Sequence, residues 1–258
     1  MVPVPYERTT SFVKGTKNAP TAILNASQQL ETFDEELKSE PYKKAPVYTL
    51  SACRLNRVPS TVEKVIKDKK IPVILGGEHS ITPGVVKTIA RHYPDLSVLQ
   101  FDAHADLRDC YQGKKVSHAC VMRRVLEICP AVQVGIRSIS AQEWEYASKT
   151  GQVDKIHWAQ KVELVEKIEN QLSRNVYITI DVDVFDPAAL PAVGTPEPGG
   201  MFWYEILDIL SRVCRDKNVV GIDLVELCPQ KGSHASDFTV AKLAYKIMGY
   251  ISSRGNSL

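Results

Sequence analysis

The sequence lacks the features of membrane, secreted and nucleic-acid-binding proteins. It has no apolar run long enough to cross a bilayer, and we expect no signal peptide, because its first residues lack the charged head and apolar run of one. Neither sign of charge is in excess, because 32 Lys and Arg balance 30 Asp and Glu to a net charge of +2. This balance gives no electrostatic reason to expect nucleic acid or an anionic membrane as a partner.

The cysteines also argue against a fold held together by disulfides or by zinc. None of the six forms a C-x-x-C pair, so a zinc or disulfide framework is not expected. Most lie beside apolar residues, and we expect reduced, buried thiols in a cytoplasmic protein. Hydrophobic residues make up 44% of the chain and charged residues 24%, which excludes disorder. We expect one domain over residues 1–258, large enough to bury roughly 70–75% of the unfolded chain's surface.

Apolar, β-branched runs alternate with segments of helical spacing. The runs lack clean alternation, as expected for strands buried on both faces of a parallel sheet. The predicted strands cover residues 72–75, 96–101, 131–134, 176–180 and 219–224. The predicted helices cover 60–69, 82–93, 117–128, 140–149, 161–173, 203–216 and 237–252, the first opened by a capping box from Ser60 to Glu63. This order predicts an α/β fold with a mostly parallel central sheet wrapped on both sides.

Charged residues follow four of the predicted strands. They are His79, then Asp102, His104 and Asp106, then Asp181 and Asp183, and finally Glu226. Ligands of open α/β sheets bind outside the carboxyl ends of the strands, so we expect these side chains to meet in one crevice. Strand alternation should put Asp102, His104 and Asp106 on one face, and should do the same for Asp181 with Asp183.

The residues before Glu226 supply four carboxylates and two imidazoles, which predicts a site for two metal ions. Four clustered carboxylates could not all stay ionised alone, whereas two divalent cations cancel their charge. Oxygen and imidazole ligands without a thiolate favour Mn²⁺ over structural zinc, with Fe, Co or Ni as alternatives. Each motif by itself is weak, because Asp and His at a strand end often cap a helix or pair with a neighbour. The occurrence of all three motifs at strand ends makes a chance grouping the less favoured interpretation.

Three segments resemble the signatures of the ureohydrolases, the arginase and agmatinase family. They are Gly-Gly-Glu-His-Ser at 76–80, Asp-Ala-His-Ala-Asp at 102–106 and Asp-Val-Asp-Val-Phe-Asp-Pro at 181–187. The similarity covers nearly the whole chain, because segments 117–119, 134–138, 194–200 and 223–229 also look like agmatinase segments in the expected order. The resemblance implies a three-layer α/β/α sandwich and a homo-oligomer, a trimer or hexamer.

The resemblance also implies roles for individual residues. One ion would be held by His79, Asp102, Asp106 and Asp181, and the other by His104, Asp102, Asp181 and Asp183. Metal binding lowers the pKa of a shared water enough to supply a hydroxide nucleophile near neutral pH. Glu226 would bind the guanidinium, Asp183 would accept a hydrogen bond from the reacting group, and His118 would carry protons at the site mouth. The alternatives are that His118 is only a polar residue at the start of a helix and that Glu226 is a buried partner of a lysine.

The substrate is expected to be a small guanidino cation. Arginases usually have an asparagine two residues after the last aspartate of the Asp-Ala-His-x-Asp motif, where this chain has Arg108. Agmatine, cleaved to urea and putrescine in polyamine biosynthesis, is therefore our first expectation. Glu197 could attract a distal ammonium or face solvent. An inward Arg108 would suit an acidic tail, as in guanidinobutyrate or formiminoglutamate. It could instead pair with Asp109 or lie at a subunit contact. Aminopropylagmatine is also open.

Two other classes of protein were weighed. A two-metal phosphoesterase would also use D-x-H and paired aspartates, but its further G-D-x-x-D and G-N-H-E motifs are absent from the sequence. A non-catalytic relative acting as a binding partner would be expected to have lost ligands. Every expected ligand is present here together with His118 and Glu226, so the sequence favours an enzyme.

Overall fold

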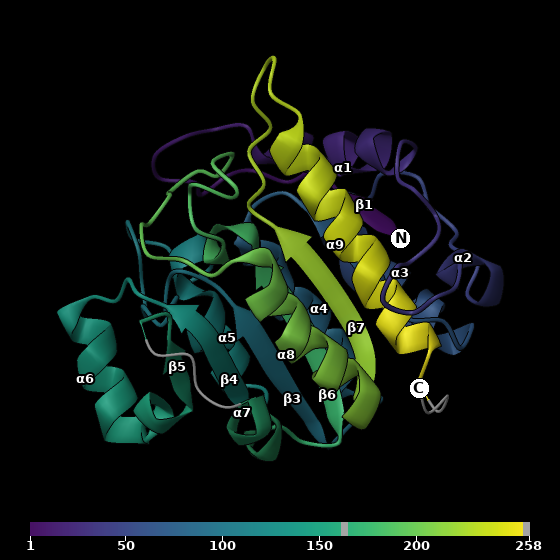
Figure 1. Cartoon of the computed structure of the whole chain (residues 1–258). Coiled ribbons are helices and arrows are strands. Elements are labelled where there is room, and N and C mark those ends of the chain that lie inside the picture. Colours follow the sequence, from purple (N-terminus) through teal and green to yellow (C-terminus); the bar gives the residue numbers. More distant parts are fainter. Residues whose placement is uncertain (161–164, 255–258) are drawn as a thin grey trace.

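The computed structural model describes residues 1–160 and 165–254, and these residues form a seven-stranded sheet in which every strand pair is parallel (Figure 1). The order of the strands across the sheet is β1-β2-β7-β6-β3-β4-β5. Their bounds are β1 Val2–Val4, β2 Val73–Gly76, β3 Leu96–Phe101, β4 Ala131–Ile136, β5 Ile156–Trp158, β6 Asn175–Asp181 and β7 Asn218–Val225. The strands that precede the candidate site residues, β2, β3, β6 and β7, are therefore close neighbours in the sheet.

The five predicted strands are confirmed as β2, β3, β4, β6 and β7. Every residue of β2, β3 and β4 is buried, which explains why these runs show no polar alternation. The two edge strands β1 and β5 were not predicted. Each has three residues, too few to display a hydrophobic period.

Helices cover both faces of the sheet, which confirms the three-layer sandwich (Figure 1). Their bounds are α1 Ala19–Ser27, α2 Pro41–Lys44, α3 Val58–Lys67, α4 Thr82–Ala90, α5 Val121–Leu126, α6 Ala141–Thr150, α7 Val165–Gln171, α8 Trp203–Asp216 and α9 Ala235–Ser252. One hydrophobic core lies between the sheet and α1, α7, α8 and α9. A second core lies between the opposite face and α3, α4, α5 and α6.

Each predicted helix has a counterpart among the described residues, but several starts differ by two to four residues, as in α5, which begins at Val121 after a 3₁₀ turn. The helix predicted over 203–216 matches α8, and α6 opens with a capping box between Ser140 and Glu143. The capping box predicted at Ser60 is wrong, because α3 already begins at Val58 and the Ser60 hydroxyl donates to the carbonyl of Arg57 at 2.9 Å. The helix predicted over 161–173 overlaps α7, and its first four residues lie outside the described residues.

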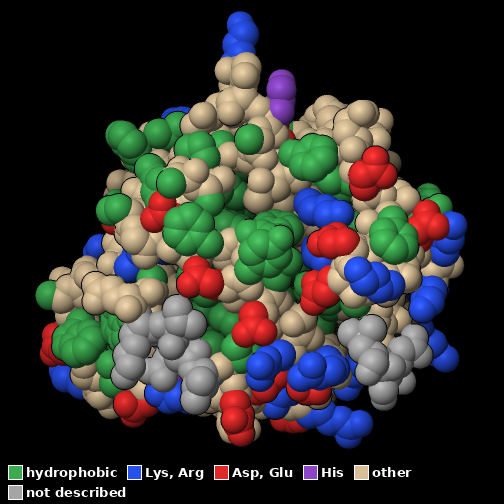
Figure 2. Space-filling model, viewed as in Figure 1, with side chains coloured by type: hydrophobic (Ala, Val, Ile, Leu, Met, Phe, Trp, Pro, Cys, Tyr) green, Lys and Arg blue, Asp and Glu red, His purple; other side chains and the backbone are tan. Residues whose placement is uncertain are grey.

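The surface carries both acidic and basic side chains. On the face that carries α8 and α9, acidic and basic side chains intermingle around exposed hydrophobic ones (Figure 2).

The six cysteines are free, and Cys120, Cys214 and Cys228 are buried as expected. Cys110 is exposed, so the expectation of buried thiols is wrong for this residue. No helix in the described part of the chain has the length and apolar character of a membrane span.

Candidate metal centre and active site

The carboxyl ends of β2, β3 and β6 bring the candidate ligands together. His79 begins a short 3₁₀ turn three residues after the end of β2, and Asp102 directly follows β3. Asp181 is the last residue of β6. We expected strand alternation to place Asp102, His104 and Asp106 on one face, and this explanation is wrong. The strand β3 already ends at Phe101, and Asp106 has a left-handed backbone with φ of 53°. A loop, rather than a strand, therefore aims the Asp102–Asp106 motif at the site.

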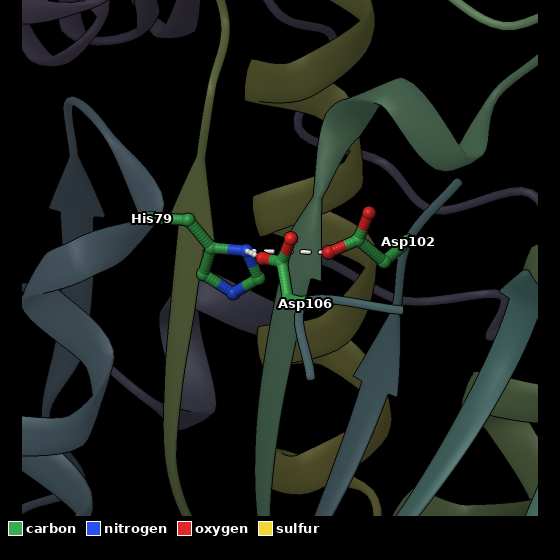
Figure 3. Close-up of side chains that lie close together, drawn as sticks. All are labelled: His79, Asp102 and Asp106. Carbon is green, nitrogen blue, oxygen red and sulfur yellow. Dashed lines mark ion pairs between the residues drawn. The ribbon is translucent and has the colours of Figure 1, made fainter. Parts of the chain in front are cut away.

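Three carboxylates surround the imidazole of His79. Its Nδ1 lies 3.2 Å from Oδ2 of Asp102 and 3.3 Å from Oδ2 of Asp106 (Figure 3). It also lies 3.4 Å from Oδ2 of Asp181. His79 and these aspartates are all buried. Among the described residues Nδ1 finds no hydrogen-bond partner of acceptable geometry. A buried nitrogen left unpaired beside three carboxylate oxygens fits a cation bound among them.

A second group forms around His104. Its Nδ1 lies 2.9 Å from Oδ2 of Asp183 and 3.6 Å from Oδ1 of Asp102. Asp102 thus turns one oxygen to each histidine and belongs to both groups. The ligand atoms of His79, Asp102 and Asp106 lie within 4.8 Å of one another, as do those of Asp102, His104 and Asp183. Each group could hold a metal ion.

The pKa values of the cluster show the electrostatic cost of placing so many carboxylates together. Burial and the neighbouring Asp102 raise the pKa of Asp106 to about 7, and burial with Asp183 raises that of Asp181 well above its usual range. Burial alone would lower the pKa of His104, but Asp183 and Asp102 raise it to about 12. The residues therefore hold protons where their charge is not otherwise balanced. Divalent cations would take the place of those protons.

Glu226 lies beside this cluster in a strained conformation. It follows β7 with φ of 64°, a left-handed conformation that costs about 1–3 kcal/mol in a residue other than glycine. Its Oε1 accepts a hydrogen bond of 2.7 Å from the backbone N of His79, and burial raises the pKa of the carboxyl to about 8. The partner of Oε1 is thus a backbone amide rather than a lysine. A bound guanidinium would favour the charged form.

His118 lies at the start of a 3₁₀ turn on the wall of the cleft. Its ring meets that of Tyr111 edge-on, with 5.5 Å between centroids. Ser11 Oγ lies 3.5 Å from its Nε2, and Thr9 Oγ1 lies 3.3 Å from its Nδ1. Burial lowers the pKa of His118 below its usual value, so the ring is mostly uncharged at neutral pH.

The segment that carries Thr9 and Ser11 was missed by the sequence analysis. Glu78 is fully buried and accepts hydrogen bonds from the Thr9 backbone N at 2.6 Å and from its hydroxyl at 2.7 Å. The adjacent Gly77 lets the chain pass, because a Cβ there would lie 2.0 Å from the carbonyl O of Tyr6. The signal that the sequence offered for this contact is an acidic residue, Glu78, placed directly after two glycines.

The cleft above the cluster has walls of mixed character. Thr10–Val13, Asp181, Asp183, Glu226 and Arg108 are among its lining residues. Nε of Arg108 lies 3.8 Å from Oε2 of Glu143, and its guanidinium lies over the Tyr111 ring, 5.3 Å from the centroid. Asp109, the partner considered from the sequence, pairs with Arg124 at 2.6 Å instead.

Glu197 lies at the margin of this region rather than among the residues that line the cleft. Its Oε1 is 3.7 Å from Nε2 of His104, and its side chain is partly exposed. The carbonyl of Glu197 accepts hydrogen bonds from Arg137, which also donates to the carbonyl of Asp183 at 2.7 Å. Arg137 thereby ties the 194–200 loop to the turn that carries Asp183, a role that the sequence analysis did not assign.

Paired His and Asp groups at the strand ends of an α/β/α sandwich define the class of metal-dependent hydrolases. The family model described as the arginase family matches residues 1–249. The chain belongs to this family, as the sequence resemblance implied, and is a ureohydrolase that acts on the C–N bonds of linear amidines.

Named relatives agree with this assignment. The chain is 41% identical over 270 residues to the N(1)-aminopropylagmatine ureohydrolase of Synechocystis sp., covering 97% of this chain and 88% of the relative. It is 34% identical to the agmatinase of Pyrococcus horikoshii, covering 95% of this chain and 89% of that protein. The crystal structure of the agmatine ureohydrolase of Thermoplasma volcanium is 32% identical, with a TM-score of 0.86 over 97% of this chain and 88% of the other.

Proposed function

We propose that this ureohydrolase removes urea from a guanidino-polyamine, with N1-aminopropylagmatine as the preferred substrate and agmatine as the second. The observation that carries the preference is the relative with the aminopropyl activity in its name, at 41% identity against 34% for the agmatinase. Hydrolysis would release spermidine from the first substrate and putrescine from the second. Agmatine, our expectation from the sequence, stays in second place because named agmatinases also cover nearly the whole chain.

The proposed ligands form two sets that share Asp102 and Asp181. One set is His79, Asp102, Asp106 and Asp181, and the other is His104, Asp102, Asp181 and Asp183. We propose Mn²⁺ as the ion, because the donors are carboxylate oxygens and imidazoles, a set that Fe, Co or Ni would also fit. When bound, the ions supply an activated water as nucleophile and polarise the substrate.

Glu226 would bind the guanidinium. The amide of His79 holds its Oε1, which leaves Oε2 for the substrate. A hydrogen bond from a guanidinium to a carboxylate oxygen is charge-assisted and therefore stronger than one between neutral groups. The carboxylate of Asp183 lies on the cleft wall nearby and would accept a hydrogen bond from the NH groups of the carbon under attack.

His118 would give a proton to the leaving amine. Because burial lowers its pKa, the ring is mostly neutral and does not repel the cationic substrate as it enters. A neutral imidazole can take up a proton from the reaction and pass it on. His118 would therefore act as a proton carrier.

The substrate tail would lie along the cleft toward the N-terminal segment. Phe12 and Val13 line the cleft there and are exposed, so they can cover the methylene groups of a polyamine. We keep Glu197 as the proposed attractor of a distal ammonium, because its partly exposed carboxylate lies near His104 at the margin of the cleft. Glu143 balances much of the charge of Arg108, which leaves the cleft open to a cationic tail.

The setting of the enzyme is part of the same proposal. We propose that residues 1–258 act as one domain, that the chain assembles as a trimer or hexamer, and that it works in the cytoplasm. Exposed large apolar side chains, among them Tyr48 and Tyr204 at 78% and 77%, could serve as contacts between copies. Light scattering of the purified protein would measure the assembly directly. A monomer at micromolar concentration would contradict it.

The test is urea release by Mn²⁺-loaded protein, with N1-aminopropylagmatine, agmatine, arginine and guanidinobutyrate compared at equal concentration. We expect the highest kcat/KM with the aminopropyl compound and a lower one with agmatine. A higher value with agmatine would reverse the preference. Release from arginine or guanidinobutyrate alone would overturn the proposal of a polyamine substrate.

A further inference from the structure

A row of buried polar side chains crosses the sheet beneath the candidate metal centre. Thr179 on β6 pairs in register with Gln100 on β3 and with Asp223 on β7, and Gln100 pairs with Gln133 on β4. Residues paired in register on neighbouring parallel strands point to the same face of the sheet. All four are fully buried. Burying four polar groups in a core costs free energy unless each finds a partner, so the row calls for a reason.

One arm of the row ends on His79. The Thr179 hydroxyl donates to Oδ1 of Asp223 at 2.5 Å, and Nε2 of His79 lies 2.8 Å from the same hydroxyl oxygen. Because the only hydrogen of the hydroxyl goes to the carboxylate, Thr179 can only accept from His79. In a neutral ring the hydrogen is then on Nε2, and the lone pair is on Nδ1, which faces the aspartates (Figure 3).

The carboxylate at the base of this arm is itself held. Oδ2 of Asp223 accepts hydrogen bonds from the hydroxyls of Tyr177 at 2.6 Å and Thr82 at 2.7 Å. Three hydroxyls, from β6 and α4, therefore converge on one buried carboxylate. The position of Thr179 is fixed from behind, and with it the orientation of His79.

The other arm ends on Asp102. Nε2 of Gln133 donates to the carbonyl of Ala105 at 2.8 Å, which fixes which end of this side-chain amide is the donor. The same nitrogen donates to Oε1 of Gln100 at 2.6 Å, and Nε2 of Gln152 donates to Oε1 of Gln133 at 3.1 Å. Gln100 must therefore present its own Nε2 to Oδ2 of Asp102, at 2.7 Å. The three amides are aligned with every donor end toward the carboxylate.

We infer that the two arms are positioning devices with different reach: the Asp223–Thr179 arm orients His79 and serves one ion, whereas the Gln152–Gln133–Gln100 arm orients Asp102 and serves both. The difference follows from the geometry, because His79 faces one group of ligands and Asp102 faces both. The inference rests on the proposed metal centre and is independent of which guanidine the enzyme cleaves.

The test is titration of metal-free protein with Mn²⁺, followed by calorimetry and by the Mn²⁺ electron paramagnetic resonance signal. We expect Thr179→Val to weaken one of the two binding events by roughly 10- to 100-fold and to leave the other unchanged, since loss of a partner that orients a ligand typically has this effect. Gln100→Met keeps the volume but removes the donor, and should weaken both events. Gln152→Met, at the far end, should weaken both by a smaller factor.

Matched controls separate orientation from general damage. Thr179→Ser keeps the hydroxyl and should bind both ions with the affinity of the parent protein. Thr88→Val removes another buried hydroxyl, one that donates to the carbonyl of Gly84 at 2.9 Å on α4, and should bind as the parent protein does. The unfolding temperature of each metal-free variant shows that it is folded.

Three outcomes would overturn the inference. They are parental affinity for both ions in Thr179→Val and Gln100→Met, equal weakening of both events in Thr179→Val, and failure of Thr179→Ser to restore binding. If Thr179→Val does not fold, Thr179→Ser and Gln152→Met still decide it, since the first must bind both ions normally and the second must weaken both. The readout needs no substrate, so an inactive protein that titrates as expected would count against the proposed function alone.

Discussion

Oγ1 of Thr9 lies 3.3 Å from Nδ1 of His118 and accepts a hydrogen bond of 3.1 Å from the backbone N of the same histidine. Thr9 donates its own hydroxyl hydrogen to Oε1 of Glu78 at 2.7 Å, so it can only accept from the imidazole. Nδ1 of the neutral His118 ring therefore carries the hydrogen, and Nε2 is the basic nitrogen.

Replacing Thr9 should thus disturb the proton carrier without disturbing the metals. Thr9→Val removes a hydrogen bond that is worth about 0.5–1.5 kcal/mol, and we expect kcat to fall roughly twofold to tenfold. Thr9→Ser keeps the hydroxyl and should retain the parental rate. Urea release with parallel metal analysis checks both variants. Loss of bound Mn²⁺ in Thr9→Val would show that the residue has a different role.

Removing His118 itself should have a larger effect on the same step. A positioned acid–base group contributes about 10²- to 10⁴-fold to a rate, so His118→Ala should lower kcat by a factor in this range. The variant should keep both metal ions, because His118 contacts Thr9 and Tyr111 rather than the His79 cluster. An unchanged rate at neutral pH would remove His118 from the mechanism.

Asp181→Ala should abolish metal loading and activity together. Asp181 lies 3.4 Å from Nδ1 of His79, and its Oδ1 accepts a hydrogen bond of 3.0 Å from the backbone N of Asp183, so it joins both proposed sets of ligands. Asp208→Ala, on the exposed side of α8, is a control that should load normally. Full metal content in Asp181→Ala, measured by mass spectrometry, would contradict the ligand assignment.

Metal removal should make stability depend on pH. The pKa of Asp106, raised to about 7 mainly by burial, means that the folded chain keeps a proton that the unfolded chain has lost. Stability is therefore lost as pH rises from the unfolded pKa of 3.8 toward 7. The raised pKa of His104 acts in the same direction above its unfolded value of 6.5.

We accordingly expect metal-free protein to unfold at a lower temperature at about pH 8 than at about pH 5.5. Mn²⁺ should raise the unfolding temperature more at the higher pH, because the ligands bind it in their deprotonated forms. Thermal unfolding with and without chelator measures both effects. A metal-free protein that becomes more stable over this pH interval would show that its carboxyls do not hold protons as the structure indicates.

The sequence pointed to residues that the structure brings together, because charges at the ends of buried strands are conspicuous. It did not predict how Asp106 reaches the site, since a left-handed backbone in an aspartate leaves no periodic pattern. Thr9 and His118 are 109 positions apart, and nothing local in either segment encodes their contact. The row of buried polar residues was visible in part, because Gln100 and Thr179 stand inside runs that are otherwise mostly apolar. Their partners could not be predicted, because they depend on the order of the strands in the sheet, which differs from their order along the chain.

Arg108 offers a test of which tail the cleft accepts. Its guanidinium lies on the cleft wall, 3.8 Å from the buried carboxylate of Glu143, and its side chain is 34% exposed. Arg108→Ala removes a cation and leaves Glu143 unbalanced, so the wall becomes more negative.

We expect this change to raise kcat/KM for N1-aminopropylagmatine by up to about fivefold, the equivalent of ~1 kcal/mol for an exposed charge pair, and to lower it for guanidinobutyrate. Arg123→Ala removes a cation that lies over the Tyr146 ring outside the cleft and should change neither value. Competition between the two substrates measures the ratio without error from protein concentration. A lower ratio of kcat/KM for N1-aminopropylagmatine to that for guanidinobutyrate in Arg108→Ala would mean that Arg108 helps to hold the cationic substrate, and would contradict the expected repulsion between Arg108 and a cationic tail.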